Sequence, residues 1–128
     1  MSEPARAGIF IYGKYPERLA DFYQAVLGMT VAHRTEQMIV LRSPDAELIV
    51  HAIPAQIASQ ITITNPPQLR ENTAIKFYCT VASFAAATDA ARALGGQVFS
   101  EQWAGPGFVV RNASDPEGNI FQVRVDAS

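Results

Sequence analysis

Residues Asp115 to Val123, DPEGNIFQV, read as a tight turn that leads into a strand. Asp115 can accept a hydrogen bond from the backbone two residues on, Pro116 presets the φ angle of the second turn position, and Gly118 tolerates a positive φ. After the turn the side chains alternate, so that Gln122 points to one face of the strand and Val123 to the other. Such a turn is common in hairpins, and its weight comes from the segments that accompany it.

Length and composition place the chain among small globular proteins. It has 128 residues, of which 48% are hydrophobic and 17% charged, with a formal net charge of −2. One domain of this size buries roughly two thirds of its unfolded surface, which is enough for a core without disulfides. No cluster of Lys and Arg indicates nucleic acid, and no apolar stretch is long enough to span a membrane. The start, MSEPARAG, lacks a secretory pattern, so we expect a cytoplasmic protein.

The single cysteine, Cys79, lies in the apolar stretch IKFYCTV. One cysteine excludes an internal disulfide and a cysteine-rich zinc site. An apolar neighbourhood favours a buried, unreactive thiol over a nucleophile.

The two halves of the chain repeat one order of elements. In the first half, GIFIYG predicts a strand, and Pro16 opens a helix that Gly28 ends. In the second half, a strand precedes an Ala-rich helix that Ser83 caps and the pair Gly95-Gly96 ends. The predicted strands cover residues 8–13, 29–34, 37–43, 46–53, 74–81, 97–101, 107–113 and 119–125. Each half therefore reads strand, helix and three strands, and two such units should pair because neither can bury its sheet alone.

Residues 54–72, PAQIASQITITNPPQLREN, separate the two units. They form either a plain linker or a loop that closes over a site or reaches a partner subunit, and QITIT alternates as an extra edge strand would. We predict one domain, residues 1–128, with module one at about 8–53, the linker at 54–72 and module two at about 73–126.

Three segments carry a resemblance to a known superfamily: ADFYQAVLGM (Ala20 to Met29), ALGGQV (Ala93 to Val98) and DPEGNIFQV. In these segments and their spacing the chain resembles the vicinal oxygen chelate superfamily, which includes glyoxalase I, bleomycin-resistance proteins and extradiol dioxygenases. The resemblance implies an α+β fold in which two βαβββ modules form an eight-stranded, half-open sheet cup. It also implies a site on the concave face of the cup and a homodimer.

Enzymes of this superfamily usually bind a divalent metal through four positions, mostly His and Glu. Aligned from the motifs, these positions hold Gly8, His51, Lys76 and Gln122. Only His51 is an ordinary ligand, and keeping Lys76 neutral at pH 7 costs about 4.6 kcal/mol. We therefore predict no catalytic metal and no cofactor, which removes the electrophile of glyoxalase, dioxygenase and epoxide-opening chemistry.

Alternation along the strands predicts which side chains line the cup. Trp103 and Phe108, near two glycines, are expected to form a mobile rim. The complete predicted ligand-binding set is Phe10, Tyr12, Ile49, His51, Lys76, Tyr78, Trp103, Phe108, Gln122 and Arg124. The opposite residues should pack under the helices: Ile9, Ile11, Val50, Phe77, Cys79, Val81, Phe121 and Val123. Apolar walls with a few polar groups are typical of small-molecule sites.

Three functions follow from this face. The first is a metal-free protein that binds a small, partly anionic or aromatic molecule, because His51, Lys76 and Arg124 favour negative charge. The second is an enzyme of the lyase, isomerase or dioxygenase type, with His51 as general base and Lys76 as electrophilic partner, or with an atypically bound metal. The third is a structural module whose cup is filled by its own side chains, with Lys76 or Arg124 paired to a carboxylate such as Glu47. The sequence leaves open whether the protein catalyses any reaction.

Overall fold

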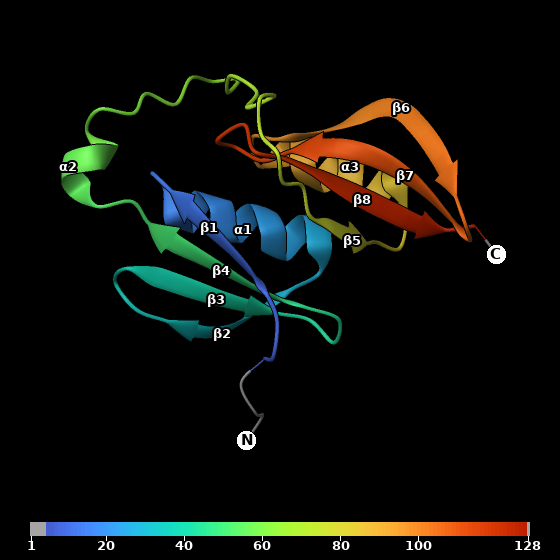
Figure 1. The fold of residues 1–128 in the computed structure, drawn as a ribbon, viewed down its shortest axis with the longest axis horizontal. Coiled ribbons are helices and arrows are strands. Elements are labelled where there is room, and N and C mark those ends of the chain that lie inside the picture. Colours follow the sequence, from blue (N-terminus) through green and yellow to red (C-terminus); the bar gives the residue numbers. More distant parts are fainter. Residues whose placement is uncertain (1–4, 128) are drawn as a thin grey trace.

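The structure, a computed structural model, describes residues 5–127. It is an α+β fold with eight strands and three helices in the described part (Figure 1). In chain order the elements are β1 (Ile9–Gly13), α1 (Pro16–Leu27), β2 (Thr30–Arg34), β3 (Met38–Arg42), β4 (Glu47–Ala52), α2 (Ala55–Ala58), β5 (Tyr78–Thr80), α3 (Phe84–Ala93), β6 (Gln97–Gly105), β7 (Phe108–Ser114) and β8 (Ile120–Asp126).

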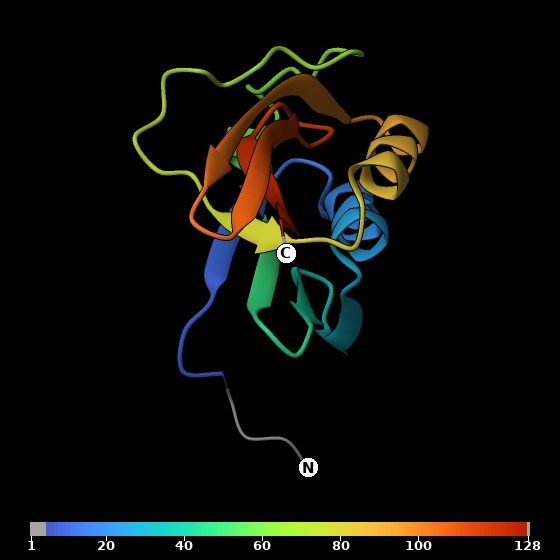
Figure 2. The ribbon, with the colours of Figure 1, turned by 90° about the vertical axis from the view of Figure 1, so that its right-hand side faces the viewer.

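The strands form two four-stranded sheets of identical topology, ordered β1-β4-β3-β2 and β5-β8-β7-β6. Strand β1 pairs with β4, and β5 with β8, in parallel, and the other neighbouring strands are antiparallel. The predicted repeat is confirmed, although the eight strands belong to two hydrogen-bonded sheets. Helices α1 and α3 pack together on one side of both sheets, behind the strands in Figure 1 and to the right of them in Figure 2. We call the opposite side of the sheets the open face.

The helix signals in the sequence act as expected. Pro16 occupies the first turn of α1, and Gly28 ends the helix in the left-handed region with φ 68°. The Ser83 hydroxyl accepts a hydrogen bond from the backbone nitrogen of Ala86 and caps α3. The apolar stripe of α1, including Leu19 and Val26, is buried. Both helices therefore begin and end where local chemistry predicts.

Aromatic packing joins the two halves of the chain beneath the sheets. The ring centroids of Phe22 and Tyr23 on α1 lie 6.0 and 5.3 Å from that of Phe121 on β8, and Phe77 stacks on Phe121 at 5.2 Å. Burying one such ring stabilises a fold by about 1.5–3 kcal/mol. The predicted helix-side residues all belong to this core or pack against it, as expected: Ile9, Ile11, Val50, Phe77, Cys79, Val81, Phe121 and Val123.

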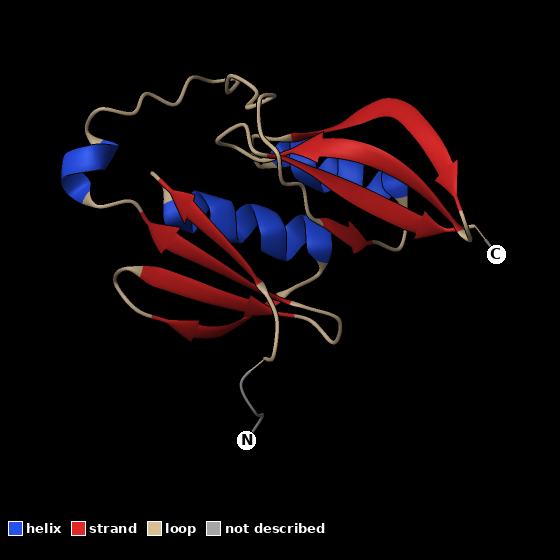
Figure 3. Ribbon diagram, viewed as in Figure 1, coloured by secondary structure: helices blue, strands red, loops and turns tan. Residues whose placement is uncertain are grey.

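The structure departs from two local expectations. Strand β5 has three residues rather than eight, so Lys76 precedes it. QITIT, residues 60–64, forms no extra edge strand, and Figure 3 shows loop from the end of α2 to β5. Trp103, expected at a rim, lies within β6, whose pairing with β7 continues past it to Gly105. Short runs of alternating polar and apolar residues do not fix the length of a strand, because a strand also needs a neighbour to pair with. Strand β5 has a neighbour only on its β8 side.

Among residues 5–127 no helix is long and apolar enough to cross a membrane.

Candidate functional site

A cavity of about 470 Å³ lies between β1 and the segment that leads into β5. It contains two of the predicted ligand-binding residues, Phe10 and Tyr12, whose side chains are 51% and 58% exposed. The residues that line it come from both halves of the chain: Gly8, Ile9, Phe10, Ile11, Tyr12, Thr73, Ile75, Phe77, Asn119 and Ile120. We call this space the seam cavity, because it lies between the two sheets. Its walls are mostly apolar, with Thr73, Asn119 and the Tyr12 hydroxyl as polar groups.

Three predicted residues form a ring cluster on the open face of the first sheet. The centroids of Phe10, Tyr12 and His51 lie 5.1 to 5.6 Å apart, and Tyr12 pairs with His51 across β1 and β4. Nδ1 of His51 lies 2.8 Å from the backbone oxygen of Ala52. Since a carbonyl oxygen only accepts, Nδ1 carries the proton, and a neutral His51 keeps a lone pair on Nε2.

The second sheet holds the cationic part of the predicted site. Cζ of Arg124 lies 3.5 Å from the ring centroid of Tyr78 and 3.9 Å from that of Phe108. Nζ of Lys76 donates to Oδ1 of Asn112 at 3.1 Å, and Asn112 pairs with Gln122 across β7 and β8.

Trp103 and Ile49 complete the predicted set. Trp103 pairs with Val110, which pairs with Arg124, so Trp103 lies on the same face and is 44% exposed. Ile49 pairs with Phe10 in the first sheet. Sequence reasoning missed Asn112. The signal for its position was the alternation along β7, which puts Asn112 on the same face as Val110.

The expected pairings of two side chains are not found. Glu47 binds Arg42 at 2.8 Å rather than Lys76 or Arg124. His51 and Lys76, the pair expected for acid–base chemistry, bond to different partners on different sheets. The structure therefore gives no geometric support for their joint action.

Strand register corrects one of the four metal positions. Counting two residues on from Gly8 and from Lys76 gives Phe10 and Tyr78, whose strand partners are Ile49 and Gln122. The equivalent of Gln122 is therefore Ile49, whereas His51 matches Arg124. The four positions thus hold Gly8, Ile49, Lys76 and Gln122, which offer one neutral oxygen and one ammonium. Within residues 5–127 no three His, Cys, Asp or Glu side chains gather as a metal would require. These residues do not fit a divalent cation.

The turn at residues 115–119 contains two buried carboxylates, Asp115 and Glu117, and both are hydrogen-bonded within the protein. Oδ1 of Asp115 accepts from the backbone nitrogens of Glu117 and Asn119, and Oδ2 accepts from the Tyr23 hydroxyl at 2.6 Å and from the Asn119 amide. Burial raises the pKa of Asp115 despite the opposing effect of these bonds. It also raises the pKa of Tyr23 well above 10, and the nearby charge of Asp115 adds to that shift.

Glu117 in the same turn holds the start of α1. Its two carboxylate oxygens accept from the backbone nitrogens of Lys14 and Tyr15 at 2.9 and 2.7 Å. Helix α1 has no side-chain cap of its own, because Tyr15 stands at its N-cap position. The carboxylate therefore holds the two residues that lead into the helix and places negative charge near the positive end of the helix.

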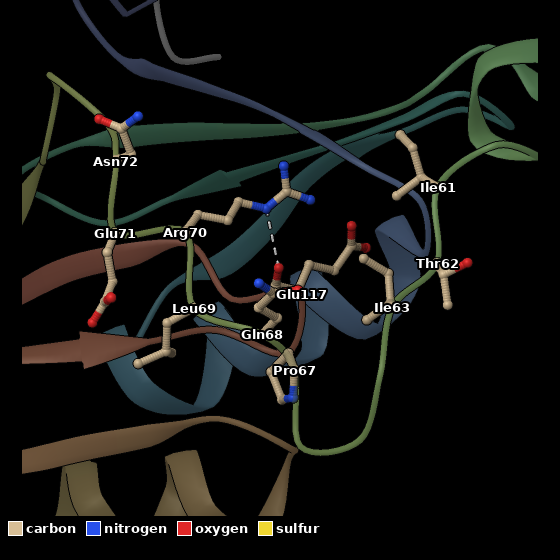
Figure 4. Close-up of a pocket in the computed structure, with 10 residues that line it drawn as sticks. All are labelled: Ile61, Thr62, Ile63, Pro67, Gln68, Leu69, Arg70, Glu71, Asn72 and Glu117. Carbon is tan, nitrogen blue, oxygen red and sulfur yellow. Dashed lines mark hydrogen bonds between the residues drawn. The ribbon is translucent and has the colours of Figure 1, made fainter.

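The linker, residues 54–72, is fastened to this same turn. The backbone nitrogen of Arg70 donates to the oxygen of Gly118 at 2.9 Å, and Nε of Arg70 donates to the backbone oxygen of Glu117 at 3.1 Å (Figure 4). A cavity of about 540 Å³ lies between residues 61–63 on one side and residues 67–72 on the other, with Glu117 between them. It is separate from the predicted ligand-binding set, none of whose members line it.

Comparisons with known proteins decide the family. The glyoxalase-like domain model matches residues 9–124. The chain belongs to this glyoxalase-like family. Its fold is that of the vicinal oxygen chelate superfamily, as the sequence motifs indicated. No curated protein sequence matches the chain.

Solved structures support the fold. A glyoxalase/bleomycin resistance protein/dioxygenase family enzyme from Burkholderia phytofirmans PsJN matches with a TM-score of 0.65 and 17% identity, over 91% of this chain and 94% of that one. A glyoxalase/bleomycin resistance protein from Albidiferax ferrireducens T118 has a TM-score of 0.65 and 19% identity, over 93% and 96%. The fosfomycin resistance protein FosX from Listeria monocytogenes has a TM-score of 0.67 and 12% identity, over 98% and 96%. At such identities the likeness concerns the fold alone.

Proposed function

We propose that this glyoxalase-like protein binds a small, partly anionic or aromatic molecule on its open face without a metal ion. The observation that carries the proposal is the seam cavity. Its volume of about 470 Å³ falls within the roughly 300–1,000 Å³ of small-molecule sites. Phe10 and Tyr12 line it and remain 51% and 58% exposed, although their rings also pack on each other and on His51. An aromatic ligand would cover that surface.

The metal-free part of the proposal rests on the donors. Gly8, Ile49, Lys76 and Gln122 stand where the superfamily's ligands are expected, and together they offer nothing that grips a transition metal. Elemental analysis of protein purified without chelator should find no nickel, zinc, iron or manganese near stoichiometric amounts. Stoichiometric metal that survives dialysis would overturn this part.

Thermal unfolding in the presence of 2-naphthoate, 2-naphthamide and 2-naphthylmethylamine tests the binding part. These probes share one aromatic ring system and differ in charge. A ligand at 100 times its dissociation constant adds about 2.7 kcal/mol to the free energy of unfolding, which is a measurable rise in melting temperature. We expect a rise with the naphthoate that is lost in Phe10→Ala. No rise with any of the three would remove the proposal.

A homodimer and a cytoplasmic location are further parts of the proposal. Exposed apolar side chains on and beside the open face support a dimer, among them Ile75 at 87% exposure and Tyr78 at 53%. Sedimentation velocity should give a dimer that Ile75→Asp weakens. The cytoplasmic location rests on the single cysteine, Cys79, which leaves no disulfide within the chain.

A further inference from the structure

The guanidinium of Arg124 lies between two aromatic rings on the open face. Tyr78 reaches it from β5 and Phe108 from β7, the strands on either side of β8. Both are diagonal neighbours, since the direct strand partners of Arg124 are Thr80 and Val110. Contact distances of 3.5 and 3.9 Å to the ring centroids fix the plane of the guanidinium. Its N–H edge is then the part left for hydrogen bonding.

That edge has no acceptor within the described part of the chain. Nε of Arg124 is buried without a hydrogen-bond partner, while the two terminal nitrogens are not enclosed in this way. Asp126 stands two residues further on the same face of β8, is exposed, and forms no ion pair with Arg124 among residues 5–127. The nearby cation Lys76 bonds to Asn112. A guanidinium carries five donors and is always charged, so a fixed one without an acceptor is prepared for an anion from outside.

Another arginine of the same sheet, Arg111, does have a hydrogen-bond acceptor in the protein. It lies on β7 and pairs with Val123, which places it on the helix side. Its Nε and Nη2 both donate to Oε1 of Gln102, at 3.1 and 3.0 Å, and its Cζ lies 4.5 Å from the centroid of the single ring of Phe84. Arg111 therefore has a side-chain acceptor in the protein, whereas Arg124 has none among residues 5–127.

We propose that Arg124 receives a carboxylate of the ligand, edge-on, through its terminal N–H groups. The inference rests on the proposed function and adds the chemical class of the charged group. This group would lie outside the seam cavity, since Arg124, Tyr78 and Phe108 do not line it. A carboxylate is flat, so its two oxygens can lie in the guanidinium plane between the rings and form the paired bonds that arginine favours. A phosphonate is tetrahedral and would push an oxygen out of that plane toward Tyr78 or Phe108. Arg124 thus acts as the residue that selects a planar anion.

Isothermal titration with three matched probes tests the inference: 2-naphthoate, its neutral isostere 2-naphthamide, and 2-naphthylphosphonate. We expect the wild-type protein to bind the naphthoate about 10- to 100-fold more tightly than the naphthamide, because bonds to a charged group are lost in the amide. The phosphonate should bind less tightly than the naphthoate. Arg124→Gln should lose the preference for the carboxylate and keep its affinity for the naphthamide, whereas Arg111→Gln should keep the full preference.

The outcomes distinguish a failure of the proposed function from a failure of the inference about Arg124. If none of the three probes binds, the proposed function fails. If naphthoate and naphthamide bind equally to the wild type, or if Arg124→Gln keeps the preference, the inference about Arg124 fails while the binding function stands. Should Arg124→Gln not fold, Arg124→Lys decides the matter, since it keeps the charge but cannot form paired bonds. It should lose most of the preference, and an unchanged preference would overturn the inference.

Discussion

The turn at residues 115–119 and the open face of the sheets differ in how far their polar groups are buried and hydrogen-bonded. In the turn, Asp115 and Glu117 are almost fully buried, and every carboxylate oxygen accepts a hydrogen bond from the protein. On the open face, Phe10 and Tyr12 are about half exposed, and Arg124 has no acceptor among residues 5–127. Groups that are satisfied internally hold a fold, whereas groups left unsatisfied are available to a ligand. The two carboxylates of the turn, which belong to a segment that indicates the family in sequence, are therefore structural.

The largest effect should come from removing the carboxylate that holds α1. Glu117→Ala leaves the partly buried backbone nitrogens of Lys14 and Tyr15 without acceptors and empties the buried place of the Glu117 side chain, and should cost about 3–4 kcal/mol of unfolding free energy. Urea unfolding measures it. Glu36→Ala, which removes an exposed carboxylate from the turn between β2 and β3, should stay within about 0.5 kcal/mol. Similar midpoints for the two variants would mean that the turn does not hold the helix.

A second prediction concerns the linker and separates docking from backbone strain. Gly118 and Gly107 both have positive φ angles, 86° and 77°, but a Cβ at Gly118 would overlap the backbone oxygen of Gln68, whereas at Gly107 nothing lies within 4 Å. Gly107→Ala should cost about 1 kcal/mol from strain alone. Gly118→Ala should cost about 2–3 kcal/mol and speed proteolysis of residues 60–72. Equal costs and equal proteolysis would contradict the docking of the linker.

A third prediction uses the pKa of Tyr23. Because its pKa in the folded protein lies well above 10, the unfolded chain loses this proton first as pH rises, and stability must fall above pH 10. The loss approaches about 1.4 kcal/mol per pH unit for one proton. Tyr23→Phe should cost about 1 kcal/mol at pH 7 and show a shallower decline between pH 9.5 and 11. Parallel pH profiles of the two proteins would show that the pKa of Tyr23 is not raised in the folded protein.

The smallest effect on stability should come from the open face. Phe10→Ala and Tyr12→Ala remove half-exposed rings and should each lower the unfolding free energy by less than about 1 kcal/mol. The same variants should lose most of their affinity for 2-naphthoate. If either ring proved as costly to remove as Glu117, the open face would be a packed surface and not a binding site.

Much of the fold was readable in the sequence because its signals are local. Pro16, Gly28 and Ser83 mark helix ends through backbone geometry and single hydrogen bonds, and the helix-side alternation follows from the strand period. The length of β5 was not readable, since it depends on a strand neighbour far along the chain. The role of Glu117 was missed for the same reason, since the backbone nitrogens of Lys14 and Tyr15 that it binds lie about a hundred residues away in the chain.

The sequence predicted which side chains belong to the candidate site but not how they are arranged. Alternation placed Tyr78 and Arg124 on one face, which the register confirms. Phe108, expected at a rim, lies on the same face, because it pairs with Asp126. Alternation gave no sign that Arg124 lies between the two rings, because that contact depends on side-chain packing across three strands. Motif counting also put the metal position of the fourth strand on His51, and only the pairing of β1 with β4 moves it to Ile49.

One measurement tests the contrast between the two regions directly: unfolding free energy and 2-naphthoate affinity, determined on Glu117→Ala and Tyr12→Ala under conditions in which both remain folded. The account predicts that Glu117→Ala loses stability and keeps its affinity, while Tyr12→Ala keeps its stability and loses its affinity. Loss of affinity in Glu117→Ala alone, with Tyr12→Ala binding as the wild type does, would place the site at the turn and contradict the account.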